Sequence, residues 1–448
     1  MKRFSLLLLV ASSLLWGVVS LAAQRPHYGG TLRIEVRESL QSFDPVAVTS
    51  AGPKGLSLLV FETLVQLDDR GRSRPLLASS WQAEPGNQRW RFQVRSGVSF
   101  SDGTPLDAAA VAASLRNSNS EWKVVAAGDA VIVETEGPDL FVPAALAQAR
   151  HGIARRSNGA LVGTGPFTIR EWTPGKHLAL AANDQYWAGR PFLDAVDVDF
   201  GKNDRDQMMM LDLARTDIAQ VATENIHRTQ AESRQVVVSQ PAELMALVFS
   251  RAPQSDDEMH ARKALAFAID TTALNNVVMQ GGGEPTAALL PNWMSGYAFI
   301  FKQEDGAHLA TQVKRNQTWT LSFDASDPVA RVVAQRIALN ARDAGITLAT
   351  SGSENHDLRL VRIPLASSET HIALEGLAKT LQLPIPSFKD ASVEDLYAAE
   401  KGLLESQRII PVLHLRSALA LRPGIHDFTI SPDAIWHLQN VWLSAEKP

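Results

Sequence analysis

Apolar and polar residues alternate along several short stretches of the chain, with the period of two that is typical of half-buried strands. Over Trp90–Arg95, apolar residues at every second position are separated by Arg, Gln and Arg. The stretches Thr31–Val36 and Val196–Phe200 show the same alternation. Further strands are expected at Leu244–Phe249, Thr318–Phe323, Ile346–Ala349 and Ile409–Leu415.

A periodicity of three to four residues predicts helices between these strands. Helices are expected at Leu56–Leu64, Arg262–Asp270, Pro328–Ala344 and Val393–Ser406. The helix at Pro328–Ala344 lies between two expected strands, which predicts a parallel strand pair with a right-handed crossover. The chain therefore has the pattern of an α/β protein with mixed sheets flanked by helices.

The run from Trp90 to Leu115 combines a strand, a turn and a helix start. Ser101-Asp102-Gly103 supplies turn chemistry, because Gly tolerates positive φ and Asp bonds to nearby backbone. Thr104 is placed to cap the following helix, with Pro105 at its first position and Asp107 three residues after the cap. The sequence thus predicts a helix that begins directly after Thr104.

Composition places the chain among folded globular proteins. Of its 448 residues, 45% are apolar and 20% are charged, and the length suggests about three domains. The formal net charge is -5, and no basic cluster is present. This balance argues against a nucleic-acid partner.

The N-terminus has the features of a secretory signal. Lys2 and Arg3 precede a largely apolar run, and small residues allow cleavage after Ala22 or Ala23. Residues 1–23 are therefore expected to be removed, with an uncleaved membrane anchor as the alternative. The chain has no cysteine, which excludes a lipid tether on an N-terminal Cys. We expect the mature protein to be periplasmic.

The sequence contains no recognisable catalytic constellation, and we expect neither an enzyme nor a cofactor or metal site. Patterns such as G-x-S-x-G, H-E-x-x-H and Walker A are absent. Ser120 and Lys123 fit S-x-x-K, but its partner motifs are missing. Asp197 and Asp199 share one face of a strand, where a polar surface is favoured over acid–base chemistry.

Two dense runs, Trp90–Leu115 and Gly163–Phe200, resemble the family 5 extracellular solute-binding proteins of ABC importers, of the dipeptide, oligopeptide and nickel-binding type. The resemblance implies a two-lobed type II periplasmic-binding-protein fold with an extra small domain. Lobe 1 would comprise residues 24–57, 163–240 and 418–448. The small domain would comprise 58–162, and lobe 2 would comprise 241–417.

The resemblance also implies a function in solute binding and transport rather than in catalysis. The protein would capture a small solute between the lobes, with a peptide or peptide-like compound favoured, and deliver it as a monomer to a membrane permease. Two alternatives stay open. One is a degenerate scaffold that acts as a sensor or interaction component, and the more distant one is a periplasmic hydrolase.

The chain departs from the family pattern at two places. The family has several dozen more residues between Leu115 and Gly163, so the small domain is expected to be shortened. The segment between Leu348 and Val393 lacks the family's G-W-x-x-D-Y motif, whose Asp pairs with the ammonium group of a bound peptide. Because of these departures, the resemblance does not identify the ligand.

Candidate ligand contacts follow from strand ends and from the resemblance. Ligands of open α/β sheets lie beyond the carboxyl ends of strands, which points to Glu38 and to Thr49 and Ser50 in the following loop. A second group of candidates comes from the C-terminal half.

Met245 occupies the place of a family Tyr pair and would give an adaptable apolar contact or pack in the core. Trp293 lies in a loop that could line the space between the lobes. Arg362 replaces the missing motif and, if directed toward the ligand, would favour an anionic group.

Overall fold

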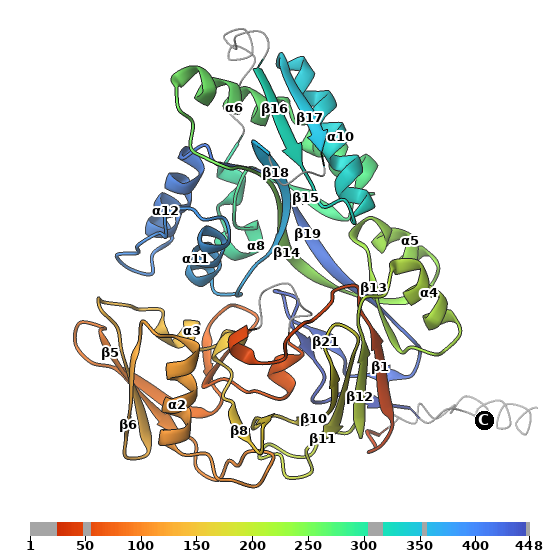
Figure 1. Cartoon of the computed structure of the whole chain (residues 1–448). Coiled ribbons are helices and arrows are strands. Elements are labelled where there is room, and N and C mark those ends of the chain that lie inside the picture. The colour runs from red at the N-terminus through yellow and green to blue at the C-terminus, as the bar shows by residue number, and fades with distance from the viewer. Residues whose placement is uncertain (1–24, 48–54, 303–316, 352–355, 445–448) are drawn as a thin grey trace, which may run out of the picture.

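The computed structural model describes residues 25–47, 55–302, 317–351 and 356–444 of the chain. We call residues 25–57, 163–240 and 418–444 lobe 1, residues 58–162 the small domain and residues 241–417 lobe 2, and these boundaries stay a prediction. Lobe 2 forms the upper part of Figure 1, above lobe 1 and the small domain. Among the described residues, no helix combines the length and apolar character needed to cross a membrane. The expected signal segment lies outside these residues.

One sheet runs through both lobes in the order β10-β11-β12-β1-β13-β19-β14-β18-β16-β17, with β15 beside β19. The lobe 1 strands are β1 (Thr31–Glu35), β10 (Phe167–Thr173), β11 (His177–Ala182), β12 (Ala195–Asp199) and β13 (Ile218–Val221). The lobe 2 strands are β15 (Gly283–Pro285), β16 (Gln317–Ser322), β17 (Ile346–Ser351) and β18 (Leu358–Pro364). Two long strands, β14 (Gln235–Phe249) and β19 (Ile409–Leu421), belong to both lobes.

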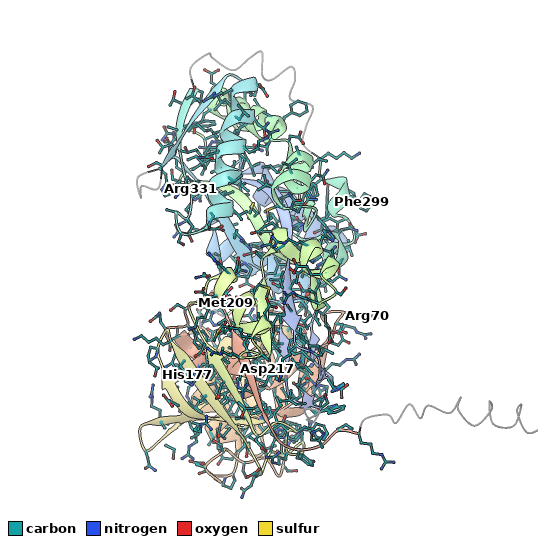
Figure 2. The ribbon with its side chains drawn as sticks, turned by 90° about the vertical axis from the view of Figure 1, so that its right-hand side faces the viewer. Arg70, His177, Met209, Asp217, Phe299 and Arg331 are labelled. Atoms are coloured by element: carbon teal, nitrogen blue, oxygen red, sulfur yellow. The ribbon has the colours of Figure 1, made fainter. Side chains whose placement is uncertain are left out.

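The hinge between the lobes is built from β14 and β19, which run side by side through the narrow middle of the molecule (Figures 1 and 2). Their ladder is regular in lobe 1, but its register shifts between Val238 and Pro241, between Pro241 and Glu243, and once more in lobe 2 between Met245 and Ala246. Proline lacks the N–H that a regular ladder needs, and a bulged strand bends at the irregularity. Residues 238–243 are therefore where the sheet can flex.

The expected β-α-β unit is present in lobe 2. Strands β16 and β17 pair in parallel, and α10 (Pro328–Asp343) connects them. Asp327 caps α10 by accepting hydrogen bonds from the backbone of Val329 and Ala330. The buried face of α10 joins the lobe 2 core that surrounds Leu247 on β14. The other helices of the two lobes are α4 (Asp204–Asp212), α5 (Ile226–Ala231), α6 (Asp256–Ala268), α7 (Thr271–Ala273), α8 (Asn292–Ser295), α11 (Thr370–Thr380) and α12 (Val393–Glu405).

The small domain has a core and a sheet of its own. Its sheet order is β4-β5-β7-β6, and helix α2 packs on it through a core that includes Phe92, Val111 and Val133. Its elements are β2 (Val65–Leu67), β3 (Ser73–Pro75), β4 (Ala78–Ala83), β5 (Arg89–Val94), α2 (Ala108–Ser118), β6 (Lys123–Ala127), β7 (Ala130–Glu134), α3 (Val142–Ala145), β8 (Arg155–Ser157) and β9 (Ala160–Val162).

The predicted start of α2 was wrong by one turn. Its cap is Asp107, whose side chain accepts from the backbone N–H of Ala110 at 2.7 Å. Thr104 instead accepts a backbone hydrogen bond from Phe100, and Ser99 forms an isolated bridge with Pro105. These bonds hold the preceding residues in a tight loop, so the helix begins only after Asp107.

The helix predicted over Leu56–Leu64 is also wrong, because only Ser57–Leu59 forms a single 3-10 turn. The backbone carbonyl oxygens of Val60 and Glu62 accept hydrogen bonds instead from the N–H groups of Gly165 and Ile153, which lie on neighbouring segments of the same chain. A Cβ added to Gly163 would lie 1.9 Å from the carbonyl oxygen of Val60, so the two segments pack backbone against backbone. That contact favours an extended path over a helix.

Short elements complete the fold. They are the 3-10 helices at Pro45–Ala47, Ala149–His151, Thr223–Asn225 and Ala298–Ile300, the π-helical turn Leu274–Val278, and the two-residue strands β20 (Ile425–His426), β21 (Thr429–Ile430), β22 (Trp436–His437) and β23 (Trp442–Leu443).

Candidate functional site

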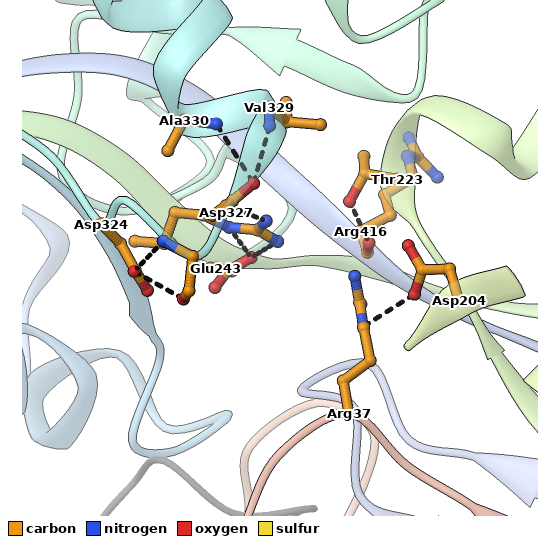
Figure 3. Close-up of polar contacts among 11 residues, drawn as sticks. Arg37, Asp204, Thr223, Glu243, Asp324, Asp327, Val329, Ala330 and Arg416 are labelled. Carbon is orange, nitrogen blue, oxygen red and sulfur yellow. Dashed lines mark hydrogen bonds and ion pairs between the residues drawn. The ribbon is translucent and has the colours of Figure 1, made fainter. Parts of the chain in front are cut away.

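The parallel strands of the two lobes direct their carboxyl ends toward the same region beside the hinge. In lobe 1, β1 pairs in parallel with β12 and β13, and in lobe 2, β16 pairs in parallel with β17 and β18. Ligands of open α/β sheets bind beyond such ends. Figure 3 shows residues from both lobes around this region, which we call the hinge-side site.

Lobe 1 contributes Arg37 and Glu38, which directly follow β1. The Arg37 guanidinium forms an ion pair with Asp204 at the start of α4, with 3.3 Å between Nε and Oδ1 (Figure 3). Glu38 accepts a hydrogen bond of 2.7 Å from the Gln220 side chain, which also accepts from the Arg37 backbone N–H. Glu38 is half-buried and held in place beside the site.

Lobe 2 contributes Arg362, which is neutralised within the protein. Its guanidinium donates to Glu243 on β14 at 2.6 and 3.1 Å and to Asp327 at 3.4 Å. The nearby Glu243 carboxylate, followed by Asp327, raises the pKa of Arg362 above its usual value. Arg362 therefore lies beside the hinge, but it offers no unpaired positive charge to an anionic ligand.

Arg416 at the site also has a carboxylate partner, whereas the carboxylate of Glu224 forms no ion pair among the described residues. Arg416 on the hinge strand β19 pairs with Glu284 on β15. Glu224, next to Thr223, is half-buried and interacts electrostatically with Asp204, Arg362 and Arg37. Its carboxylate accepts a hydrogen bond from its own backbone N–H, and within the described part of the chain it forms no ion pair. Burial raises its pKa above the usual value.

Trp293 on α8 is half-buried and contacts the hinge itself. Its indole Nε1–H donates to the carbonyl oxygen of Pro241 at 2.8 Å, at the irregular stretch of β14. The loop before α8 is anchored by Glu400, whose carboxylate accepts from the backbone N–H groups of Leu289 and Leu290 at 2.6 and 3.0 Å. Trp293 is thus placed between a fixed loop and the hinge.

The other sequence candidates fall elsewhere. Met245 is completely buried in the lobe 2 core, where it meets the second of the two roles considered for it. Thr49 and Ser50 lie outside the described residues. Of the six candidates, the structure brings Glu38, Trp293 and Arg362 to the hinge region.

Sequence reasoning missed most of the charged residues of the site. Asp327 follows β16 in the predicted β-α-β unit, so the strand-end argument that selected Glu38 could also have found it. Glu224 follows β13, which no alternation of the sequence indicated. Glu243 lies inside a strand that was expected only from Leu244 onward. The pairing of Arg362 depends on contacts across the sheet that a single sequence does not reveal.

Among the described residues, no group of three or more His, Asp or Glu side chains has the arrangement of a metal site. Asp197 pairs with Arg170 at 3.4 Å and Asp199 with His177 at 2.9 Å on the surface of lobe 1.

Two surface grooves are also present, and the first of them borders the hinge-side site through Asp204 and Gln220. One, of about 640 Å³, lies between α4 and α5 and is lined by Met208, Met209 and Arg234 among others. The other, of about 870 Å³, lies in the small domain beside Arg95 and Trp187. Neither contains a candidate from the sequence.

Comparison with known proteins now places the chain. The model of the bacterial extracellular solute-binding proteins, family 5, matches residues 73–363. The probable D,D-dipeptide-binding periplasmic protein DdpA of Escherichia coli is 23% identical over 57% of this chain and 56% of its own length. The protein YhjP of Bacillus subtilis is 31% identical over 37% of this chain and 31% of its own length. The chain thus spans 31% to 56% of the length of these two relatives.

Solved structures share the fold over nearly the whole chain. The murein tripeptide binding protein MppA of Escherichia coli superimposes with a TM-score of 0.78 at 17% identity, over 93% of this chain and 99% of its own. NikA of Staphylococcus aureus, solved with Ni(L-His)2, gives a TM-score of 0.75 at 16% identity, over 92% and 100%. The two-lobed periplasmic-binding-protein fold expected from the sequence is confirmed. This chain belongs to the family 5 bacterial extracellular solute-binding proteins.

Proposed function

We propose that this chain captures a small solute between its lobes and delivers it to an ABC permease at the membrane, acting as a periplasmic monomer. The solute is a peptide or peptide-like compound. The protein performs no chemistry on it. Relatives named for dipeptides, oligopeptides and nickel support this class of function.

The observation that carries the proposal is the convergence of strand ends from both lobes at the hinge-side site. A solute held there contacts Arg37 and Glu224 from lobe 1 and Glu243 and Asp327 from lobe 2. Such a solute stabilises the closed arrangement because it binds both halves at once.

The charges of the site favour a solute that carries a positive group. Arg37, Arg362 and Arg416 each have a carboxylate partner. Glu224 forms no ion pair among the described residues, and a half-buried carboxylate is stabilised by a close cation or a further hydrogen-bond donor. The ammonium group of a peptide supplies both. Glu224 would thereby take the role that the family gives to the Asp of its missing motif.

The test is a thermal-shift screen of the mature, ligand-stripped protein against short peptides, their N-acetylated forms and peptide-like solutes. We expect free-amine peptides to raise the melting temperature and the acetylated forms to do so much less. Glu224→Gln should weaken binding of the selected peptide by about 10- to 100-fold. Glu232→Gln is the matched control, because Glu232 is exposed and pairs with Arg228 and Arg234.

A screen in which no solute shifts the melting temperature would contradict the proposal and favour the degenerate-scaffold alternative. Equal binding of free and acetylated peptides would retain solute capture but reject the role of Glu224.

A further inference from the structure

The small domain contacts lobe 2 directly, at a place separate from the hinge. In Figure 1, α3 of the small domain lies beneath α11 of lobe 2, on the side of the molecule away from β14 and β19. The ring of Phe141, which precedes α3, stacks on the ring of His371 on α11, with 4.2 Å between centroids and 21° between planes. Phe388 of lobe 2 packs edge-on against both rings, at 5.7 and 4.7 Å.

Lobe 2 holds its half of this contact in position by itself. His371 is 5% exposed, and its Nδ1 lies 2.8 Å from Oε1 of Glu369. The other carboxylate oxygen of Glu369 accepts from the backbone N–H of Ile372 and so caps α11. The imidazole is thereby held by the capping residue of its own helix, and Phe141 of the small domain packs against it.

Two further contacts join the same surfaces. A Cβ added to Gly71, in the β2–β3 turn, would lie 2.4 Å from the carbonyl oxygen of Ser368, so the two backbones touch. Asp139 of the small domain interacts electrostatically with Glu375 and Lys379 on α11. Ring stacking, backbone contact and charge therefore meet along α11 and the residues just before it.

We propose that this contact, which we call the clasp (Gly71, Phe141, Ser368, His371 and Phe388), is the device that holds the two lobes closed. The hinge strands connect the lobes covalently on one side, and the clasp connects them by packing on the other. Opening the hinge separates Phe141 from His371 and exposes both rings to water. The small domain thus sets the balance between open and closed forms, and hence how fast a captured solute leaves, which rests on the proposed function.

An aromatic stack contributes about 0.5–1.5 kcal/mol beyond the burial of its area, equivalent to a factor of about 2 to 10 in an equilibrium. We therefore expect Phe141→Ala to shift the open–closed equilibrium of the ligand-free protein toward the open form by at least that factor. Phe141→Tyr, which keeps the ring, should restore most of the closed population.

The absence of cysteine from the chain allows the measurement to be made directly. Asp129→Cys in the small domain and Glu394→Cys on α12 place fluorophores on exposed residues of the two sides. Single-molecule energy transfer on the mature chain then counts open and closed molecules without any ligand. Phe299→Ala is the control, because Phe299 is 68% exposed on the surface of lobe 2 (Figure 2).

A shift toward low transfer in Phe141→Ala and in His371→Ala, with none in Phe299→Ala, supports the clasp. Unchanged transfer histograms in both clasp variants, with melting temperatures near the wild-type value, overturn it. A failure to find any solute leaves this result intact, because the assay needs no ligand and so tests the clasp apart from solute capture.

Discussion

Replacement of Glu400 by glutamine should remove a pH dependence of stability that this buried carboxylate creates. Glu400 on α12 is completely buried and accepts hydrogen bonds from Leu289, Leu290 and the hydroxyl of Tyr297. Burial raises its pKa from 4.5 to about 7. The folded protein therefore binds a proton at this residue in a pH range where the unfolded chain has released it.

The difference between the pKa of Glu400 in the folded and the unfolded protein sets the size and the sign of this pH dependence. Each unit of pKa shift is worth about 1.36 kcal/mol, so a rise from 4.5 to about 7 corresponds to about 3 kcal/mol. Because the folded-state pKa is the higher one, the full stabilisation is present below pH 4.5. The free energy of unfolding then falls as the pH rises toward 7 and levels off above it.

Glutamine at position 400 can keep these hydrogen bonds but has no carboxyl group to titrate. Its amide oxygen can accept from the two backbone N–H groups, and its amide N–H can donate to the Tyr297 oxygen. Urea unfolding of the wild type and Glu400→Gln at pH 5 and pH 8 should show the wild type losing up to about 3 kcal/mol more than the variant. Glu405→Gln, an exposed change on the same helix, should follow the wild type. A Glu400→Gln protein that retains the full wild-type fall would refute the reasoning.

Three other substitutions test the packing and the charges. Glu62→Ala leaves the hydrogen-bond donors of Thr164, Tyr186 and Trp187 without their shared acceptor. It should therefore lower the free energy of unfolding, measured by urea titration, by about 3 kcal/mol, and a loss below about 1 kcal/mol would contradict this account. Gly163→Ala, whose added Cβ would lie 1.9 Å from the Val60 carbonyl oxygen, should lower the free energy of unfolding by about 3 kcal/mol. Gly137→Ala, whose added Cβ meets nothing within 4 Å, should change it little. Arg362→Met leaves Glu243 and Asp327 without their ion-pair partner and should lower the free energy of unfolding by about 3 kcal/mol in a urea titration; a loss below about 1 kcal/mol would argue against the ion-pair explanation.

Much of the fold could be predicted because its strands carry a local signal. Trp90, Phe92 and Val94 are 9%, 0% and 8% exposed, as their alternation implies. The β16-α10-β17 unit followed from the order of periodic segments alone. The helix expected at Leu56–Leu64 failed because its apolar residues are buried by contact with Gly163 and Gly165, which lie a hundred residues away.

The site was less predictable for the same reason. The strand-end argument placed Glu38 near the hinge, but the pairing of Arg362 depends on a neighbouring strand and on the cap of α10. That pairing neutralises the positive charge on which the expected preference for an anionic group rested. The predicted shortening of the small domain and the replacement of the G-W-x-x-D-Y segment stay predictions.

Hydrogen–deuterium exchange tests the central claim most directly. The ligand-stripped mature protein is compared with and without the peptide that gives the largest thermal shift. Capture between the lobes predicts slower exchange at residues 220–225, 241–245 and 327–330, from both lobes, with Glu224→Gln reducing this protection. Protection confined to one lobe would contradict the account.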